Sequence, residues 1–391
     1  MPIINRIAGF HADMTAWRRD LHAHPELGFE LPRTSAVVAE KLREFGVDEV
    51  VTGIAKTGVV GVIRGRNPEN GRAIGLRADM DALPILEETG APYASLNPGM
   101  MHACGHDGHT TMLLGAARYL AETRNFDGTV YVIFQPAEEG EGGGRVMVEE
   151  GLFERFPMSQ VFGMHNWPGI PAGTFHWRNG PIMAATGEIV ITVTGHGAHG
   201  AKPNEGIDPI LVAAHIVTAL QSIVARNMEP TEAGVVTIGT ISAGQADNVI
   251  PERAVMRGTA RWFNPAVGDV LEAGVKRIAT GIAAGFGAKA EVIFRRNYPA
   301  TINDEEATAH TVRAAATVSG EARVLPMERP TMGAEDFSYM LNAKQGSYIM
   351  LGTGSGPNDP GLHHPLYDFN DETLPVGASY WATLAEQLLR G

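Results

Sequence analysis

The residues with the clearest chemical character lie in one stretch, residues 101–111, which reads Met-His-Ala-Cys-Gly-His-Asp-Gly-His-Thr-Thr. This stretch holds Cys104, the single cysteine of the 391-residue chain, among three histidines. Thiolate and imidazole are borderline-soft donors that suit zinc, cobalt, nickel or manganese. Because a Cys-x-His pair alone is a weak pattern, Cys104, His106 and His109 are at this point only candidate ligands.

Two further segments strengthen a metal hypothesis. Glu138 and Glu139 follow the strand-like run Thr129–Phe134, in the sequence Gln-Pro-Ala-Glu-Glu-Gly. Adjacent carboxylates at a strand end can divide the work, one holding a metal while the other acts as a general base on water. Their spacing does not say which glutamate would hold the metal and which would act as the base. The box Gly-Met-His-Asn-Trp then supplies His165.

These boxes together resemble the hippurate hydrolase and N-acyl-amino-acid amidohydrolase branch of the two-metal aminoacylase and carboxypeptidase superfamily. The similarity includes Trp17–Phe29 near the start of the chain and the Gly-Leu-His-His-Pro box at 361–365 near its end. Several separate boxes in the same order make the match specific, and it covers nearly the whole chain.

The resemblance implies a ligand set for two divalent ions (Zn, Mn, Ni or Co), namely Cys104, His106, Glu139, His165 and His363. It also implies that Glu138 is the base that deprotonates water and later protonates the leaving amine. His363 and His364 compete for one position, and the family's Leu-His-x-Pro pattern matches His363. His102 and His109 are then interpreted as partners that stabilise the loop.

The resemblance gives further residues a role. Asp81 matches an aspartate that orients a metal ligand, whereas Asp79 stands where the family usually has a histidine. His199, in a glycine-rich box, matches a histidine that reaches the active site of the neighbouring subunit, although His196 stands where we expect a lysine. Asn248 matches a donor to the substrate carboxylate, and Arg261 is interpreted as a second clamp on that group.

The elements that must position these residues alternate between strands and helices. We expect helices over 7–21 and 34–45, strands over 57–64 and 72–77, and a loop entering a helix over 101–120. From residue 188 the pattern changes to strand-helix-strand-strand-helix-strand, which is typical of an α/β sandwich with an antiparallel sheet. A short turn at His22 to Pro25 is expected to end the first helix.

The predicted fold class is therefore α/β, with two domains, as the chain length also suggests. Residues 1–184 and 298–391 are predicted to form a metal-binding, zinc-peptidase-like catalytic domain with a mixed central sheet flanked by helices. Residues 185–297 are predicted to form the inserted α/β sandwich, for which the resemblance implies a lid and dimerisation role. A homodimer or dimer-based oligomer is therefore expected.

Composition excludes several other classes. A formal net charge of −13 without clustered Lys and Arg argues against a nucleic-acid partner. No uninterrupted apolar run approaches a membrane span, and the N-terminal segment lacks a secretory pattern. A single cysteine excludes an intrachain disulfide and fits a reducing, cytoplasmic compartment.

The function expected from these observations is a metal-dependent amidohydrolase that acts on linear amides. Its substrates would be small N-acyl or N-aroyl amino acids such as hippurate, cleaved to a carboxylic acid and a free amino acid. The alternative is a dipeptidase or carboxypeptidase-type metallopeptidase, and a more distant one is a non-catalytic metal-binding relative. A nucleotide-dependent oxidoreductase is disfavoured, because Gly140–Gly144 lacks the spacing of a dinucleotide fingerprint.

Overall fold

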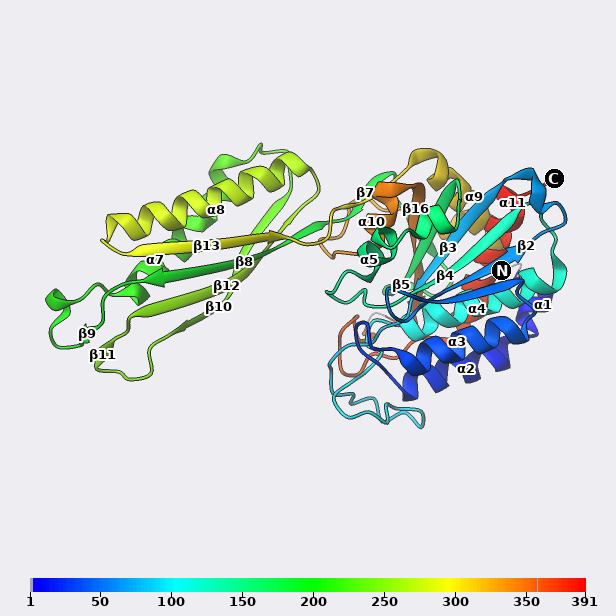
Figure 1. Cartoon of the computed structure of the whole chain (residues 1–391), viewed down its shortest axis with the longest axis horizontal. Coiled ribbons are helices and arrows are strands. Elements are labelled where there is room, and N and C mark those ends of the chain that lie inside the picture. Colours follow the sequence, from blue (N-terminus) through cyan, green and yellow to red (C-terminus); the bar gives the residue numbers. More distant parts are fainter. Residues whose placement is uncertain (1–2, 357) are drawn as a thin grey trace. The chain divides into compact units, whose positions relative to one another are not determined.

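A computed structural model describes residues 3–356 and 358–391 (Figure 1). The chain divides into two compact units. Unit 1 comprises Met1–Ile182, Thr301–Pro330 and Asp336–Gly391, and unit 2 comprises Met183–Ala300 and Thr331–Glu335. Unit 2 is therefore inserted into unit 1, which contains both ends of the chain.

Unit 1 is built on a sheet with the strand order β1-β2-β4-β3-β5-β16-β6-β15 among the described residues. β3 is parallel to β4 and to β5, and β16 is parallel to β5. β2 is antiparallel to both of its neighbours, β1 and β4. The strands are β1 Glu49–Ile54, β2 Gly58–Arg64, β3 Ala73–Asp79, β4 Thr129–Gln135, β5 Gln160–Pro171, β6 Phe175–Trp177, β15 Val324–Pro326 and β16 Gln345–Gly354. A separate pair joins β7 Gly180–Met183 to β14 Thr301–Asn303.

Helices cover this sheet. The long helix α4, His106–Thr123, packs across β2, β3, β4 and β5 and also against the C-terminal helix α11, Leu374–Leu388. Almost every residue in the first three turns of α4 is buried, which explains its apolar sequence. The other helices are α1 Asn5–Ala8, α2 His11–Ala23, α3 Pro32–Glu44, α5 Gly143–Glu149, α6 Leu152–Arg155, α9 Glu305–Ser319 and α10 Phe337–Ala343, with 3₁₀ turns at η1 Pro68–Asn70, η4 Glu321–Arg323 and η5 Asp371–Thr373.

Unit 2 has a four-stranded antiparallel sheet in the order β10-β12-β8-β13, covered by two helices. Its core elements, in chain order, are β8 Ala185–Thr194, α7 Pro209–Ser222, β10 Gly234–Ala243, β12 Arg253–Trp262, α8 Pro265–Gly285 and β13 Lys289–Arg296. β8 alternates strictly between buried and half-buried residues, as a strand with one covered face should. Smaller pieces are β9 Ala198–His199, η2 Pro203–Glu205, the π-helical η3 Ile223–Asn227 and β11 Val249–Ile250.

The first and last strands of unit 2 are neighbours in its sheet. In this antiparallel pairing Gly187, near the start of β8, lies opposite Arg296 at the end of β13. The chain therefore enters and leaves the sheet of unit 2 at one end of two adjacent strands (Figure 1).

The predicted α/β class is confirmed, including the strand-helix-strand-strand-helix-strand order of the insert. Local differences have identifiable causes. The edge strand β1 was not predicted, because its residues are mostly exposed and carry no alternating pattern. The helical stretch after β4 is divided into α5 and α6 at Gly151, whose φ of 85° ends the first helix.

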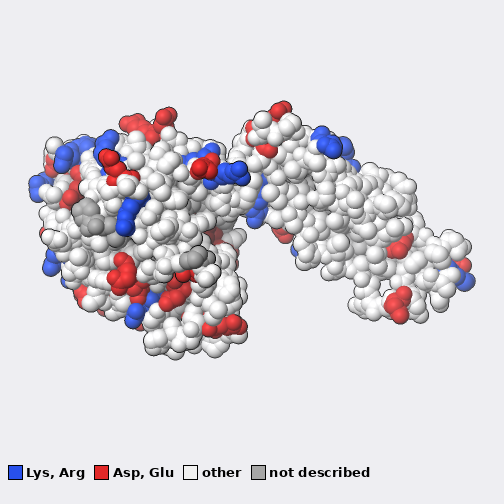
Figure 2. All heavy atoms as spheres, turned by 180° about the vertical axis from the view of Figure 1, so that it is seen from behind, with Lys and Arg blue, Asp and Glu red and all other residues white. Residues whose placement is uncertain are grey.

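One helical stretch, Pro209–Asn227, is long and apolar enough to cross a bilayer when judged only by length and composition. In the structure its residues Val212, Ala213, Ile216 and Leu220 belong to the core of unit 2. Figure 2 shows Lys, Arg, Asp and Glu side chains intermingled on the visible face of unit 1 and sparse on that of unit 2. No large basic patch is visible on the face of either unit that Figure 2 shows.

Candidate metal centre

The candidate ligands of unit 1 gather where the order of the parallel strands reverses. β4 lies on one side of β3 and β5 on the other, so the chain crosses β3 between β4 and β5. The carboxyl edge of a sheet at such a reversal is the usual place for an active-site crevice. The segments after β3 and β4 carry Asp81, Glu138 and Glu139, and β5 itself carries His165.

Cys104 belongs to two groups of possible metal ligands. Its sulfur lies with His106 and His165 in one group, and with Glu139 and His363 in the other, the donor atoms within each group being no more than 4.8 Å apart. The structure thus brings together all five candidate ligands that the sequence suggested, from loops and strands far apart in the chain. A sulfur shared by two groups can contact two cations.

Hydrogen bonds fix which nitrogen each histidine presents. His106 Nδ1 lies 2.8 Å from the carbonyl oxygen of Asp81 and His165 Nδ1 lies 2.6 Å from that of Asn166, so each Nδ1 donates its proton to the backbone. Each Nε2 is then left with a lone pair, and that of His165 faces Cys104 Sγ at 3.4 Å. This is the usual preparation of an imidazole ligand by its neighbours.

Two buried atoms in this cluster have no hydrogen-bond partner: His106 Nε2 and Glu139 Oε1. They lie 3.9 Å from each other, and His363 Nε2 lies 3.3 Å from the same Glu139 oxygen without a hydrogen bond. Buried polar atoms are almost always paired, so two such atoms facing one point need an explanation. A cation held between them satisfies both, and the thiolate, imidazole and carboxylate donors fit such a cation.

The electrostatics of the cluster favour positive charge. Burial and the nearby carboxylates of Glu139 and Glu138 raise the pKa of the Cys104 thiol well above its usual value. Burial by itself would lower the pKa of His106, but Asp79 and Asp81 outweigh it and raise that pKa to about 10. The negative surroundings that favour a proton on Nε2 would equally favour a metal cation there.

Asp81 supports the pair of glutamates. Its two carboxylate oxygens accept hydrogen bonds from the backbone N–H of Glu138 at 2.9 Å and of Glu139 at 3.0 Å. Ala137, just before them, has a φ of 57°, an uncommon value for a residue with a side chain. The turn is therefore held in a tight conformation that places both carboxylates beside His106.

The structure separates His363 from its neighbour. His363 has a φ of 65° and its ring lies in the group with Cys104 and Glu139. His364 turns back on its own loop, where its Nδ1 accepts a hydrogen bond from the N–H of Leu366 at 3.1 Å. Among the described residues, only the first of the two is near the cluster.

His109 lies close to the cluster, but both of its ring nitrogens are engaged. Its Nδ1 donates to Asp79 at 2.6 Å, and its Nε2 accepts the backbone N–H of Asn166 at 2.9 Å. Asp79 is held in turn by the buried Arg77 at 2.7 Å. These residues serve as supports around the ligands, as the sequence analysis expected for His109.

In unit 2 the candidate residues are divided between the two ends of the sheet. The exposed residues His199 and Asn248 are neighbours, because β9 pairs with β11 and the N–H of Gly200 donates to the Asn248 carbonyl at 2.7 Å. Arg261 lies near the other end of β12, opposite Thr186, and donates to the Thr186 and Thr259 hydroxyls. The length of β12 separates Asn248 from Arg261 by roughly 25 Å. A single copy of unit 2 therefore does not hold one carboxylate with both residues, contrary to what the sequence suggested.

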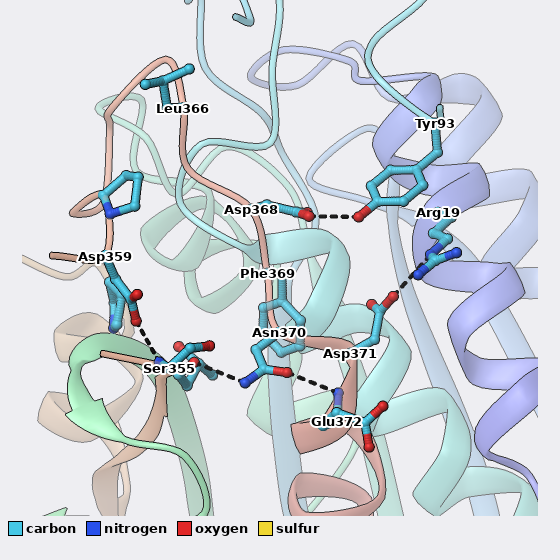
Figure 3. A pocket seen from close by; sticks show the side chains of 13 residues that line it. Arg19, Tyr93, Ser355, Asp359, Leu366, Asp368, Phe369, Asn370, Asp371 and Glu372 are labelled. Atoms are coloured by element: carbon cyan, nitrogen blue, oxygen red, sulfur yellow. Dashed lines mark hydrogen bonds and ion pairs between the residues drawn. The ribbon is translucent and has the colours of Figure 1, made fainter. Parts of the chain in front are cut away.

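A cavity of about 400 Å³ lies elsewhere in unit 1, beside Tyr93 and the segment Leu366–Glu372 (Figure 3). It contains several acidic residues, but most are already engaged. Asp371 pairs with Arg18 and Arg19, and Asp368 accepts the hydroxyl of Tyr93 at 2.5 Å. We therefore do not assign a further cation site to this cavity.

Sequence reasoning missed some of the residues that hold the candidate ligands in place. Asn166 and Tyr367 are buried and join different segments that carry candidate ligands, and His22, at the expected end of the first helix, is buried against Asp107 at 2.8 Å. The position of Asn166 beside His165 was a usable signal, because residues next to a ligand often orient it. Nothing local distinguishes Tyr367.

Comparisons with known proteins agree with this geometry. The family model for the peptidase family M20/M25/M40 matches residues 75–387. The chain is 42% identical to the hippurate hydrolase of Campylobacter jejuni over 100% of both chains, and 40% identical to an N-acetylcysteine deacetylase of Bacillus subtilis over 96% of this chain and 97% of that one. A solved dinuclear metal-binding peptidase of the M20 family from Bacillus subtilis superposes with a TM-score of 0.83 at 37% identity, covering 98% of this chain and 99% of that one.

Fold and site together define a two-domain protein with a largely buried cluster of candidate metal ligands, to which the exposed His363 is added. The chain belongs to the M20/M25/M40 peptidase family, and within it to the amidohydrolases. The resemblance noted from the sequence motifs is thus confirmed.

Proposed function

We propose that the protein hydrolyses the amide bond of N-acyl or N-aroyl amino acids, including hippurate-like compounds, to a carboxylic acid and a free amino acid. The observation that carries this proposal is the pair of donor groups that share Cys104, with the carboxylate of Glu138 beside them. The full-length identity to a hippurate hydrolase supports the choice of substrate.

In this proposal Cys104, His106, His165, Glu139 and His363 would hold two divalent ions, with Cys104 belonging to both groups of donors. When bound, the ions would lower the pKa of water and polarise the amide carbonyl, which is the chemistry that zinc, manganese, nickel or cobalt supplies. The ligand chemistry fits all four metals, and elemental analysis of gently purified protein would identify the native one.

The protein's own groups then handle the protons. Glu138, buried beside His106, takes a proton from the attacking water and returns it to the nitrogen of the breaking amide bond. Asp81 keeps this carboxylate in place through the backbone. An imidazole such as that of His199 can donate a hydrogen bond to the developing oxyanion.

We further propose that the active form is a homodimer. Arg261 and the pair of His199 and Asn248 lie at opposite ends of the sheet of unit 2, so one copy cannot offer all three to a single small substrate. A second copy can supply the missing end. Unit 2 also exposes Ile210, Leu211 and Ile241, which are 45%, 49% and 52% accessible and suit an interface.

We place the enzyme in the cytoplasm, whose reducing conditions preserve a thiolate ligand.

Replacing the base tests the proposal directly. Glu138→Gln should keep both metal ions but lower kcat by roughly 10²- to 10⁴-fold, because the proton acceptor is lost while the shape is kept. Glu141→Gln, three residues away and exposed, should keep wild-type turnover. Retained activity in Glu138→Gln would refute the assigned role.

The substrate class needs a separate measurement. Rates on hippurate, N-acetyl amino acids and dipeptides, measured side by side with the metal-loaded enzyme, should favour the N-acyl compounds. A strong preference for dipeptides would instead make the protein a dipeptidase. No turnover of any of these compounds by a protein that binds two ions would favour a non-catalytic relative.

A further inference from the structure

We infer that Asn166 is a positioning residue for the metal centre, because its amide group fastens together the three separate segments that carry Cys104, His165 and His363. This inference rests on the metal centre proposed above. It concerns a residue that contributes no ligand and has no proton to transfer, and its effect would be exerted through the ligands.

The side chain of Asn166 joins two of these segments directly. Its Nδ2 donates a hydrogen bond to the carbonyl oxygen of Cys104 at 2.6 Å, and its Oδ1 accepts one from the hydroxyl of Tyr367 at 2.7 Å. Asn166 itself is fully buried and directly follows His165 in β5. One carboxamide therefore connects the Cys104 loop, the His165 strand and the loop that follows His363.

The chemistry of these contacts requires an amide at this position. A carbonyl oxygen can only accept a hydrogen bond, so Cys104 needs a donor, whereas the Tyr367 hydroxyl donates and needs an acceptor. An aspartate has the same shape but would place a carboxylate oxygen against the Cys104 carbonyl. An alanine would leave both partners buried and unpaired, which is costly.

The backbone of Asn166 adds a third connection. Its N–H donates to Nε2 of His109, whose Nδ1 is bound to Asp79 at the end of β3. The strand that carries His165 is thus tied to the first turn of α4, which begins at His106. Both ring nitrogens of His109 are engaged by these two partners, so its ring acts as a spacer between strand and helix.

The His363 loop is held at two points. The backbone N–H of His363 donates to the carbonyl of Ala103 at 2.8 Å, and Tyr367, four residues later, reaches Asn166. One contact fixes the loop to Ala103, which precedes Cys104, and the other fixes it to the side chain that binds the Cys104 carbonyl. Because the Cys104 sulfur belongs to both donor groups, a small displacement of its loop would change its distance to both ions together.

The space around the amide is already filled. A Cβ built on Gly105 would lie 2.5 Å from Asn166 Nδ2 and 2.6 Å from the Tyr367 hydroxyl. The Cys104 loop therefore lies directly against the carboxamide, with no room for a bridging water. The contacts are direct, and their loss cannot be repaired by solvent without moving the loop.

The test uses full-length protein loaded with Co²⁺, whose thiolate charge-transfer absorption reports on the bond to Cys104. Asn166→Asp and Asn166→Ala should bind the second Co²⁺ at least 10-fold more weakly than wild type and show a weaker or shifted charge-transfer band. Tyr367→Phe, a milder change that removes a single hydroxyl, should shift the band in the same direction by a smaller amount.

Asn303→Ala is the matched control. Asn303 is also a buried asparagine of unit 1, and it joins separate segments through hydrogen bonds to the backbone of Tyr348 at 2.7 and 2.8 Å and to the Arg178 carbonyl at 2.9 Å. It touches none of the proposed ligands. Its replacement should lower the stability to urea while leaving the cobalt band and both affinities as in wild type.

Three results would overturn the inference. One is an unchanged band and unchanged affinities in Asn166→Ala, and another is equal loss of the band in Asn303→Ala, which would reduce the effect to general stability. If Asn166→Ala does not fold, an unchanged band in Tyr367→Phe has the same force. Failure of wild-type protein to show any thiolate band would instead refute the proposed metal centre itself, so the two failures are distinguishable.

Discussion

Three histidines around Cys104 show how immediate neighbours decide what an imidazole can do. His106 and His165 each give the Nδ1 proton to a backbone carbonyl, which leaves Nε2 available as a ligand. His109 has both nitrogens engaged, by Asp79 and by Asn166. His106 and His109 come from the same box, three residues apart, so residue type alone does not separate ligand from support.

Asp81 should matter for metal binding although it is not a proposed ligand. In Asp81→Asn, one of the two acceptor oxygens that hold the N–H groups of Glu138 and Glu139 becomes an NH₂ group, which repels one of those donors. We expect metal affinity or kcat to fall by about 10- to 100-fold. Isothermal titration with Zn²⁺ and steady-state kinetics would measure this. Asp304→Asn, which exchanges one good helix cap for another in α9, should change neither quantity.

His22 should make stability depend on alkaline pH. Burial opposes its charge, but hydrogen bonds with Asp107 and Glu87 outweigh burial and raise the pKa of His22 from 6.5 to about 9. A pKa raised by folding stabilises the folded state fully below pH 6.5, and this contribution is lost as the pH rises through 9. Its size is about 3 kcal/mol.

Urea unfolding across that pH window would measure the effect. The free energy of unfolding of wild type should exceed that of His22→Gln near neutral pH, and the difference should shrink as the pH approaches the raised pKa. A difference that stays constant with pH would show that His22 contributes by packing and not by charge.

At this scale the sequence suggests the candidate ligands and some of their supports, such as Asp81 and His109, and misses other supports. The five ligand candidates stand in boxes whose residue types reveal their chemistry. Asn166 and Tyr367 do not, because an asparagine and a tyrosine have many ordinary roles and their meaning here depends on contacts between positions 104, 166 and 367. Such long-range contacts are not encoded in any local pattern.

Among the elements, the loop that enters α4 combines a left-handed backbone with crowding at Gly105. Gly105 precedes this helix with a φ of 86°, and a Cβ there would meet Asn166 and Tyr367. Gly99, earlier in the same loop, has a nearly equal φ of 84° but nothing within 4 Å of the added atom. A comparison of substitutions at the two glycines therefore separates the cost of the left-handed backbone from the cost of crowding.

Alanine at each position gives a matched pair. Both Gly99→Ala and Gly105→Ala should lose about 1–2 kcal/mol of stability from the left-handed backbone. Gly105→Ala should lose about 1–3 kcal/mol more from crowding, and should also bind metal more weakly. Chemical denaturation of the metal-free proteins measures the first effect and metal titration the second. Equal behaviour of the two variants would contradict the assigned role of the Gly105 turn.

Strands and helices with clear periodicity were predicted from sequence, including every main element of unit 2. The exceptions are elements whose existence depends on tertiary pairing. β1 is mostly exposed and exists through its pairing with β2, and β5 continues to Pro171 because β16 pairs with it along almost its whole length. The turn-rich sequence from Pro168 to Gly173 favours a loop, and the neighbouring strand overrides that preference.

At the scale of the whole molecule, the question is which subunit completes each active site. If His199 acts on the partner's site, then two inactive variants, Glu138→Gln and His199→Ala, should complement each other when mixed under conditions that exchange subunits. Each mixed dimer would contain one site with Glu138 from one chain and His199 from the other. Statistical exchange should restore about a quarter of wild-type activity, since half of the dimers are mixed and each has one complete site.

The measurement is hydrolysis of the best N-acyl substrate before and after exchange, with sedimentation confirming dimers throughout. Mixing Glu138→Gln with Glu138→Gln,His199→Ala should restore nothing and serves as the control. Absence of recovery in the first mixture, with exchange demonstrated, would mean that His199 does not act across the dimer.

The pairing of Gly187 with Arg296 has an implication for how this architecture can change over generations. Residues 183–300, the main part of unit 2, enter and leave its sheet through two adjoining strands about 5 Å apart, so they form a cassette with its two ends together, to which the short segment Thr331–Glu335 is added. A short linker could replace the cassette, and a foreign one of similar width could be grafted in its place. Recognition, assembly and the residues that unit 2 is proposed to lend to the active site can therefore diversify in one module, while the five candidate ligands stay in the other.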